Sequence, residues 1–154
     1  MNPFPRLTLA LACLALACLA LSAPALGDEI RFHPPAGAGD KLPFSEAVEA
    51  GNVLYLSGMI GNRPGTSELV PGGIQAETRQ AMENIRDTLQ RHGGAMKRVV
   101  KCTVFLADMA EWAAMNEVYV QFFPGGKPAR SALGASGLAL GARVEIECLA
   151  VLDD

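Results

Sequence analysis

The sequence predicts an α+β fold, in which two helices pack on one face of a single sheet of about six strands. Residues 99–106 and 144–152 have the β-branched content or the apolar alternation of strands. Two other stretches repeat apolar residues at helical spacing and end at glycine or proline. The chain has 154 residues, of which 50% are hydrophobic and 19% are charged. This is enough for one core, too short for two, and too apolar for a disordered chain.

The N-terminal segment has the pattern of a secretory signal peptide. Arg6 precedes an apolar run over residues 7–21, and small residues with a proline follow. The run is shorter than the ~20 residues that span a bilayer comfortably. We expect residues 1–27 to be removed on export, leaving residues 28–154 as a periplasmic or secreted domain without a membrane anchor. The alternatives are an uncleaved anchor helix or a lipid anchor at Cys18.

The first part of the exported domain is expected to be strand and loop. Residues 28–41 indicate a short strand and then a loop, because Pro-Pro and Gly-Ala-Gly cannot continue a strand ladder. Residues 44–61 indicate a β-hairpin with Ala-Gly-Asn as its turn. Residues 62–73 are rich in glycine and proline and are expected to form a loop.

Two amphipathic helices are predicted. The first covers residues 74–91 and stops at His92-Gly93-Gly94, and its apolar face consists of Ile74, Thr78, Ala81, Ile85 and Leu89. The second covers residues 110–123 and ends before Pro-Gly-Gly. We expect the apolar face of this helix to pack into the core rather than to form a ligand site. This face consists of Trp112, Met115, Tyr119 and Phe122.

The remaining strands are predicted at residues 99–106, 129–135 and 144–152. Side chains alternate across a strand. Glu145 and Glu147 therefore share one face of the last strand, while apolar residues occupy the other face. The chain has no third layer to cover the mixed face. It is either solvated or the inner wall of an oligomer, and the residues alone favour neither.

Four cysteines are present, and two of them, Cys13 and Cys18, belong to the predicted signal peptide. The other two, Cys102 and Cys148, each lie in an apolar, strand-like run. Export permits a disulfide. A buried free thiol is nevertheless the usual state in such a run, so we predict two free thiols.

Composition and motifs exclude several functional classes. The 13 basic and 16 acidic residues give a net charge of −3, which disfavours binding to a phosphate backbone. The sequence contains no HExxH or paired CxxC motif, no GxGxxG after a strand and no Walker loop. We therefore expect no metal and no cofactor. His33, in a proline-rich loop, is expected to be exposed, and His92 to cap a helix.

Arg130 and the Glu145/Glu147 pair remain as chemically suggestive residues. The planar guanidinium suits a substrate carboxylate, which it can bind through two parallel hydrogen bonds. A glutamate on a half-covered sheet face can accept a proton from water and orient that water for attack. Residue types alone favour the alternative of a structural ion pair between Arg130 and a nearby glutamate.

Six ordered motifs together resemble the RidA/YjgF family of enamine/imine deaminases, also called endoribonuclease L-PSP. The resemblance covers residues 29–152, and the motifs are VxxGN at 48–52, LSG at 56–58, VKCTVFL at 100–106, NEVY at 116–119, PARS at 128–131 and VEIE at 144–147. It implies a chorismate-mutase-like α+β fold with a six-stranded mixed sheet. It also implies a homotrimer with an active site in each cleft between subunits.

The resemblance implies a role for each matching residue. Arg130 would bind the carboxylate of a 2-imino or enamine acid, and Glu145 would position the attacking water. Ala132 would offer backbone hydrogen bonds, while Ser57 and Asn116 would line or support the site. The products would be a 2-keto acid and ammonia, formed without a cofactor because a protonated imine is already electrophilic. The other implied activities are non-catalytic binding of small carboxylates and, less favoured by the acidic charge, ribonuclease activity.

The sequence departs from the family pattern at the rim of the implied pocket. Gly-Pro-Tyr-Ser-Gln in the family is Leu-Pro-Phe-Ser-Glu at residues 42–46 here. Phe44 therefore lacks the hydroxyl that faces the ligand, Leu42 replaces a small glycine, and Met59 stands where glutamine is common. These changes indicate either an altered substrate shape or an inactive protein that keeps an anion-binding cleft.

Overall fold

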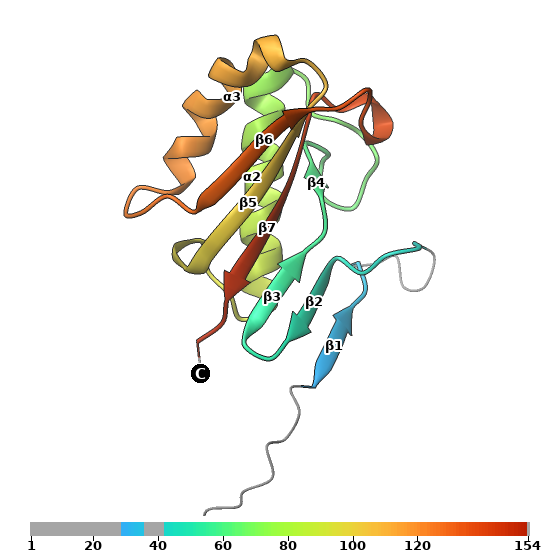
Figure 1. Ribbon diagram of the computed structural model, residues 1–154. Coiled ribbons are helices and arrows are strands. Elements are labelled where there is room, and N and C mark those ends of the chain that lie inside the picture. The colour runs from blue at the N-terminus through green and yellow to red at the C-terminus, as the bar shows by residue number, and fades with distance from the viewer. Residues whose placement is uncertain (1–28, 36–41, 154) are drawn as a thin grey trace, which may run out of the picture.

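The computed structural model describes residues 29–35 and 42–153 (Figure 1). The predicted signal peptide, residues 1–27, lies outside these ranges. The described helices and strands are, in chain order, β1 (Ile30–His33), β2 (Ala47–Ala50), β3 (Val53–Leu56), β4 (Met59–Ile60), α2 (Gly73–Arg91), β5 (Val99–Leu106), α3 (Trp112–Tyr119), β6 (Ala129–Gly134) and β7 (Val144–Val151). Short 3₁₀ segments flank them at η2 (Met96–Arg98), η3 (Met109–Glu111), η4 (Val120–Phe122) and η5 (Ala139–Gly141).

The described strands form one mixed sheet in the order β1-β2-β3-β7-β5-β6, with β4 also paired to β7. β5 and β6 run parallel, and the other pairs are antiparallel. The predicted α+β class is confirmed. The sheet has seven strands rather than six, because the second arm of the predicted hairpin breaks at Ser57 and Gly58 into β3 and β4.

The core lies between the sheet and α2. Figure 1 shows α2 running behind the sheet and α3 beside β6, so both helices cover the same face. Burial alternates along β5 and β7 as the sequence pattern predicts. The largest side chains that α2 and the two strands bury completely are Met82, Ile85, Leu89, Val104, Leu106 and Ile146. Burying each such side chain stabilises the fold by about 1.5–3 kcal/mol.

The second predicted helix is shorter and less regular than expected. Residues 109–122 form η3, α3 and η4 in succession. Met115 and Tyr119 are buried as predicted, but Trp112 is 43% exposed and does not belong to the core. Trp112 lies at the start of α3, where this helix extends over Arg130 at the sheet edge rather than over the core.

The prediction of two free thiols is wrong. Cys102 and Cys148 are joined by a disulfide, with their Cα atoms 4.1 Å apart. The antiparallel register of β5 and β7 places these residues directly opposite each other. Because opposite residues point to the same sheet face, both sulfur atoms lie together beneath the helices. Each cysteine was correctly placed in a buried strand, but the strand register was not available from the local pattern.

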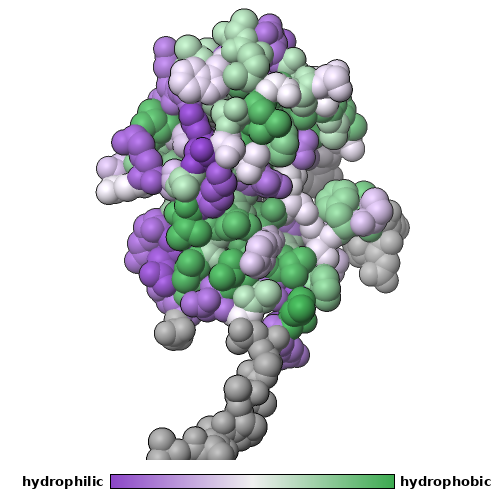
Figure 2. Space-filling model, in the orientation of Figure 1, coloured by the Kyte–Doolittle hydropathy of each residue, from purple (hydrophilic) through white to green (hydrophobic). Residues whose placement is uncertain are grey.

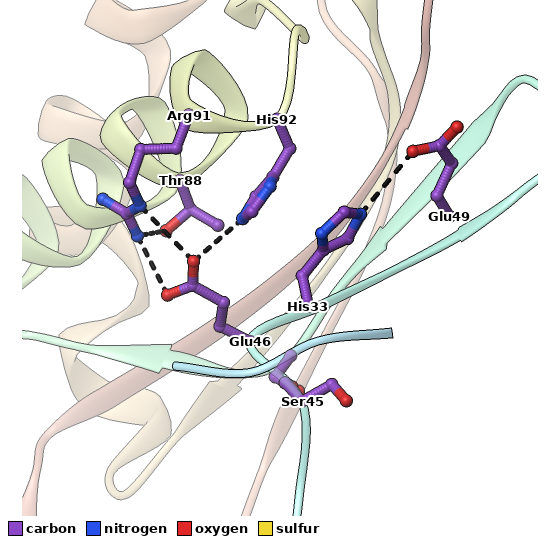
Figure 3. A network of polar contacts seen from close by, with 8 residues as sticks. His33, Ser45, Glu46, Glu49, Thr88, Arg91 and His92 are labelled. Carbon is purple, nitrogen blue, oxygen red and sulfur yellow. Dashed lines mark hydrogen bonds and ion pairs between the residues drawn. The ribbon is translucent and has the colours of Figure 1, made fainter. Parts of the chain in front are cut away.

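A polar network ties the N-terminal strands to the end of α2 (Figure 3). Glu46 accepts hydrogen bonds from Arg91 at 3.0 and 3.3 Å and lies 2.8 Å from Nε2 of His92. The His92 ring stacks on His33, with ring centroids 4.1 Å apart. His33 is therefore half-buried rather than exposed. Glu46 replaces the family's glutamine, and its charge is matched here by the Arg91 guanidinium.

No helix in the described part of the chain is long and apolar enough to cross a membrane. Likewise, no group of three or more histidine, cysteine, aspartate or glutamate side chains in that part of the chain is arranged to hold a metal ion.

Replacing both bridged cysteines tests the disulfide. Cys102→Ala/Cys148→Ala should lower the free energy of unfolding by about 4 kcal/mol, because the bridge closes a loop with a sequence separation of 46 residues. Urea unfolding of the oxidised protein and the double variant measures the difference. Wild-type protein treated with a reductant should match the variant, and equal stability of oxidised and reduced protein would contradict the prediction.

A second substitution tests the Glu46 network. Glu46→Gln should lower the free energy of unfolding by about 1–2 kcal/mol, because the hydrogen bonds from Arg91 lose the charge on their acceptor. Urea unfolding at neutral pH gives the value, and Glu68→Gln on an exposed loop serves as the matched control. Equal stabilities of the two variants would show that the network contributes nothing.

Candidate functional site

Arg130 lies in β6, at the edge of the sheet that α3 covers. In register it pairs with Cys102, a residue whose side chain faces the helices. Arg130 therefore points to the helix side. Its Nη1 donates a hydrogen bond of 2.6 Å to Oδ1 of Asn116. The Cζ atom lies 4.8 Å from the ring centroid of Tyr119 and 5.9 Å from that of Trp112.

No acidic side chain in the described part of the chain forms an ion pair with Arg130. The structural ion pair that residue types favoured is therefore not formed. Asn116 engages one N–H group of the guanidinium. An arginine fork carries further donors, so those left over can bind an anion.

The neutral ring of Tyr119 lies against the Arg130 guanidinium. Only 5% of the residue is exposed, and among the described residues its hydroxyl has no hydrogen-bond partner. Burial raises the pKa of Tyr119 to about 12, and the positive charge of Arg130 opposes that rise. The phenol therefore stays protonated at neutral pH.

Glu145 lies in β7 and points to the open face of the sheet. It pairs with Phe105 and Ile60, and its neighbours in sequence, Val144 and Ile146, are fully buried on the helix side. A Cβ atom on Gly58 would lie only 1.9 Å from Oε1 of Glu145. The carboxylate thus rests against the Gly58 backbone, where any side chain would displace it.

Ser57 fixes the strand break beside Glu145. Its Oγ donates a hydrogen bond of 2.6 Å to the carbonyl of Ser45, and its backbone N–H donates one of 3.0 Å to the carbonyl of Glu46. The break borders a hollow of 510 Å³ on the open face, whose polar walls include Ser57, Lys101, Thr103 and Glu147. Ser57 thereby positions the Gly58 backbone on which the Glu145 carboxylate rests.

The two central residues of the predicted site are not brought together within one chain. Arg130 faces the helices at the edge strand, and Glu145 faces the opposite side of the sheet two strands away. Ala132 follows Arg130 on the helix side and packs against the core. Phe44 is 52% exposed, ahead of β2. A single copy therefore presents two half-sites rather than one cleft.

Sequence analysis missed the contribution of Trp112, Tyr119 and Gly58. Tyr119 is in the core as predicted and Trp112 is not. Helical periodicity is the same for a core stripe and for a stripe that covers one side chain, so it does not reveal that both rings lie against Arg130. Gly58 belongs to the LSG motif at 56–58, and its role is signalled only by a glycine in the middle of a strand pattern, which often marks a close approach of another group to the backbone.

The open face also carries an apolar patch, seen in Figure 2 as a group of green residues in the lower part of the coloured surface. It spans β1, β2, β3 and the end of β7, and by strand register it consists of Ile30, Phe32, Val48, Val53, Tyr55, Leu149 and Val151. Phe32 is 70% exposed, Ile30 58% and Tyr55 45%. A continuous apolar patch of this kind marks an interaction surface.

The described chain is a single-sheet α+β protein with two candidate half-sites, one at Arg130 and one at Glu145. The family model described as endoribonuclease L-PSP matches residues 38–152. The chain belongs to this family, which is the RidA/YjgF family that the six motifs indicated.

Sequence relatives agree with this family. The chain is 43% identical over 109 residues to a mouse protein named 2-iminobutanoate/2-iminopropanoate deaminase, covering 71% of this chain and 81% of that protein. It is 39% identical over 110 residues to Reactive Intermediate Deaminase A of the Arabidopsis thaliana chloroplast, covering 71% and 59% respectively.

Solved structures agree as well. The crystal structure of yeast Mmf1 has a TM-score of 0.72 and 34% identity, and the match covers 81% of this chain and all of that one. The crystal structure of RidA from an Antarctic Psychrobacter species has a TM-score of 0.69 and 35% identity, covering 82% and 98%.

The close approach of Gly58 and Glu145 gives a structural prediction. In Gly58→Ala the new methyl group should push the Glu145 carboxylate out of its position, visible in a crystal structure. The loss in unfolding free energy should stay below about 1.5 kcal/mol, because a flexible side chain can change rotamer. This loss should vanish in the Glu145→Ala background. An unmoved carboxylate in the Gly58→Ala crystal would contradict the expectation.

Proposed function

We propose that this chain is an exported, cofactor-independent imine deaminase. It hydrolyses 2-imino acids and their enamine tautomers to 2-keto acids and ammonia. One observation carries the proposal. Arg130, which pairs with no acidic side chain among the described residues, and Glu145, which rests against Gly58, lie on opposite faces of one sheet. The names of the mouse and Arabidopsis relatives support the same chemistry, that of a deaminase-like enzyme.

Arg130 binds the substrate carboxylate through charge-assisted hydrogen bonds, and Asn116 holds the guanidinium from the other side. Binding in this way fixes the imine carbon next to the water. Glu145 accepts a proton from that water as its oxygen attacks the imine carbon, and the C=N double bond becomes a C–N single bond. The carbinolamine nitrogen then takes the proton from Glu145 and leaves as ammonia, while the hydroxyl oxygen releases its proton to solvent and forms the C=O bond. Water is consumed, and no oxidant or reductant is needed.

The active unit is proposed to be a homotrimer with its sites between subunits. Arg130 lies on the edge strand β6, and Glu145 lies on the open face, so a second copy must bring the two half-sites together. The apolar patch lies on the same open face of the sheet as Glu145 and offers a surface that a second copy can cover. The β6 edge of one copy would contact the open sheet face of the next, so two different surfaces meet. Such a heterologous contact forms a closed ring when its rotation closes. The family resemblance supports a ring of three.

The other predicted residues have supporting roles in this cleft. Ser57 holds the strand break against which Glu145 rests. Ala132 offers its backbone beside Arg130, and the exposed Phe44 contributes an apolar rim without a hydroxyl. The chemistry needs only the arginine and the glutamate. The rim changes therefore affect which imino-acid side chains fit.

Export rests on the signal-peptide pattern of residues 1–27. The bridge between Cys102 and Cys148 supports it, since disulfides persist in oxidising compartments. An exported deaminase also needs a source of imines there, such as an amino-acid oxidase.

Mixing two inactive variants tests both the reaction and the shared site. An amino-acid oxidase generates imines, and semicarbazide traps those that remain unhydrolysed. Arg130→Ala and Glu145→Gln should each reduce hydrolysis at least about hundredfold. After the two are unfolded and refolded together, about a quarter of wild-type activity should return, because that fraction of sites pairs an intact arginine with an intact glutamate.

The controls separate the alternatives. Each variant refolded alone should remain inactive, and wild-type protein should survive the same treatment. Recovery of no activity from a properly assembled mixture would contradict the shared site. Wild-type protein that binds 2-keto acids but hydrolyses no imine would make this chain a small-carboxylate binder. Cleavage of RNA that persists in Arg130→Ala would instead support ribonuclease activity.

A further inference from the structure

Arg130 lies against one stripe of α3, formed by Trp112, Asn116 and Tyr119. Their spacing of four and then three residues puts these side chains on the same face of the helix. That face is turned toward β6. Asn116 in the middle accepts a hydrogen bond from the guanidinium, and the aromatic rings stand one helical turn before and after it.

We propose that Trp112 and Tyr119 are positioning residues, which orient the Arg130 guanidinium so that its free N–H groups face the substrate carboxylate. The inference rests on the proposed function, because it assigns a role within the same half-site. The rings act through Arg130 and need not touch the substrate.

Aromatic rings suit this task better than an acid would. A carboxylate next to Arg130 would engage the guanidinium N–H groups and compete with the substrate for them. The faces of Tyr119 and Trp112 attract the cation through their π-electrons and leave those donors free. The neutral state of Tyr119 serves the same purpose, since a tyrosinate would form an ion pair with the arginine.

The exposure of the rings fits a positioning role. Trp112 is 43% exposed although it lies in the apolar stripe of a helix. Its contact with Arg130 gives a reason for a tryptophan at a position that contributes nothing to the buried core. Tyr119 is buried, and its hydroxyl finds no partner among the described residues, so its ring rather than its hydroxyl makes the contact with Arg130.

Binding of 2-oxobutanoate, a 2-keto acid, provides the test because it requires the arginine clamp but no hydrolysis. Isothermal titration gives Kd, and the oxidase-coupled assay gives KM and kcat. Trp112→Leu and Tyr119→Leu should each raise Kd and KM about three- to tenfold and change kcat less than twofold. Tyr119→Phe keeps the ring and should recover the affinity lost in Tyr119→Leu. Val120→Ala, at an exposed position just after α3, is the matched control.

Each outcome either supports or contradicts the positioning role of the two rings. If Tyr119→Leu fails to fold, Trp112→Leu still tests the idea, since Trp112 lies outside the core. A lowered kcat with unchanged KM and Kd would indicate a purely structural role and overturn the proposal. Tyr119→Phe binding as poorly as Tyr119→Leu would also overturn it, because the hydroxyl would then be the binding group.

A further variant separates this inference from the proposed function. In Arg130→Gln the clamp is absent, so adding Trp112→Leu should not weaken binding further. An additional loss would mean that the ring contacts the ligand itself, against the inference. Tight binding of 2-oxobutanoate without any imine hydrolysis would refute the deaminase proposal and leave the aromatic positioning of Arg130 intact.

Discussion

The antiparallel register of β5 against β7 is the constraint on which the rest of the structure depends. It sets Cys102 opposite Cys148 and Glu145 opposite Phe105. The first pair fills the core as a disulfide, and the second leaves a carboxylate on the open face. Since side chains alternate along a strand, a slip by one residue would bury the glutamate and expose the sulfur atoms. Core packing and site geometry are therefore fixed together.

The same sheet separates the two chemically important residues. Pairing of β6 with β5 directs the Arg130 side chain toward α3. Pairing of β7 with β5 directs the Glu145 side chain away from the helices. One chain thus places the proposed carboxylate-binding residue at the edge of its sheet and the proposed base on the open face. If neighbouring copies unite them, assembly becomes part of the active site rather than an addition to it. An isolated subunit would then lack a site even with every residue in place.

Much of the fold could be predicted because its signals are local. The alternation around Ile146 and the helical repeat around Ile85 each report on a few neighbouring residues, and the structure confirms both. The pairing of Cys102 with Cys148 depends on two distant strands, so no local pattern contains it. The family resemblance was enough to identify Arg130 and Glu145, because motifs are local. Their placement on opposite faces depends on how distant strands pair, so it could not be predicted.

The disulfide also determines what happens to the chain when it is cut. The segment between Cys102 and Cys148 contains α3, β6 and the first half of β7, and with them Trp112, Asn116, Arg130 and Glu145. Its turn at residues 124–127 is exposed. A protease that cleaves this turn once leaves the two pieces covalently joined through the bridge, with β6 and β7 still on one of them. In any compartment where thiol reductants are scarce, such a nicked molecule can keep both half-sites in one unit.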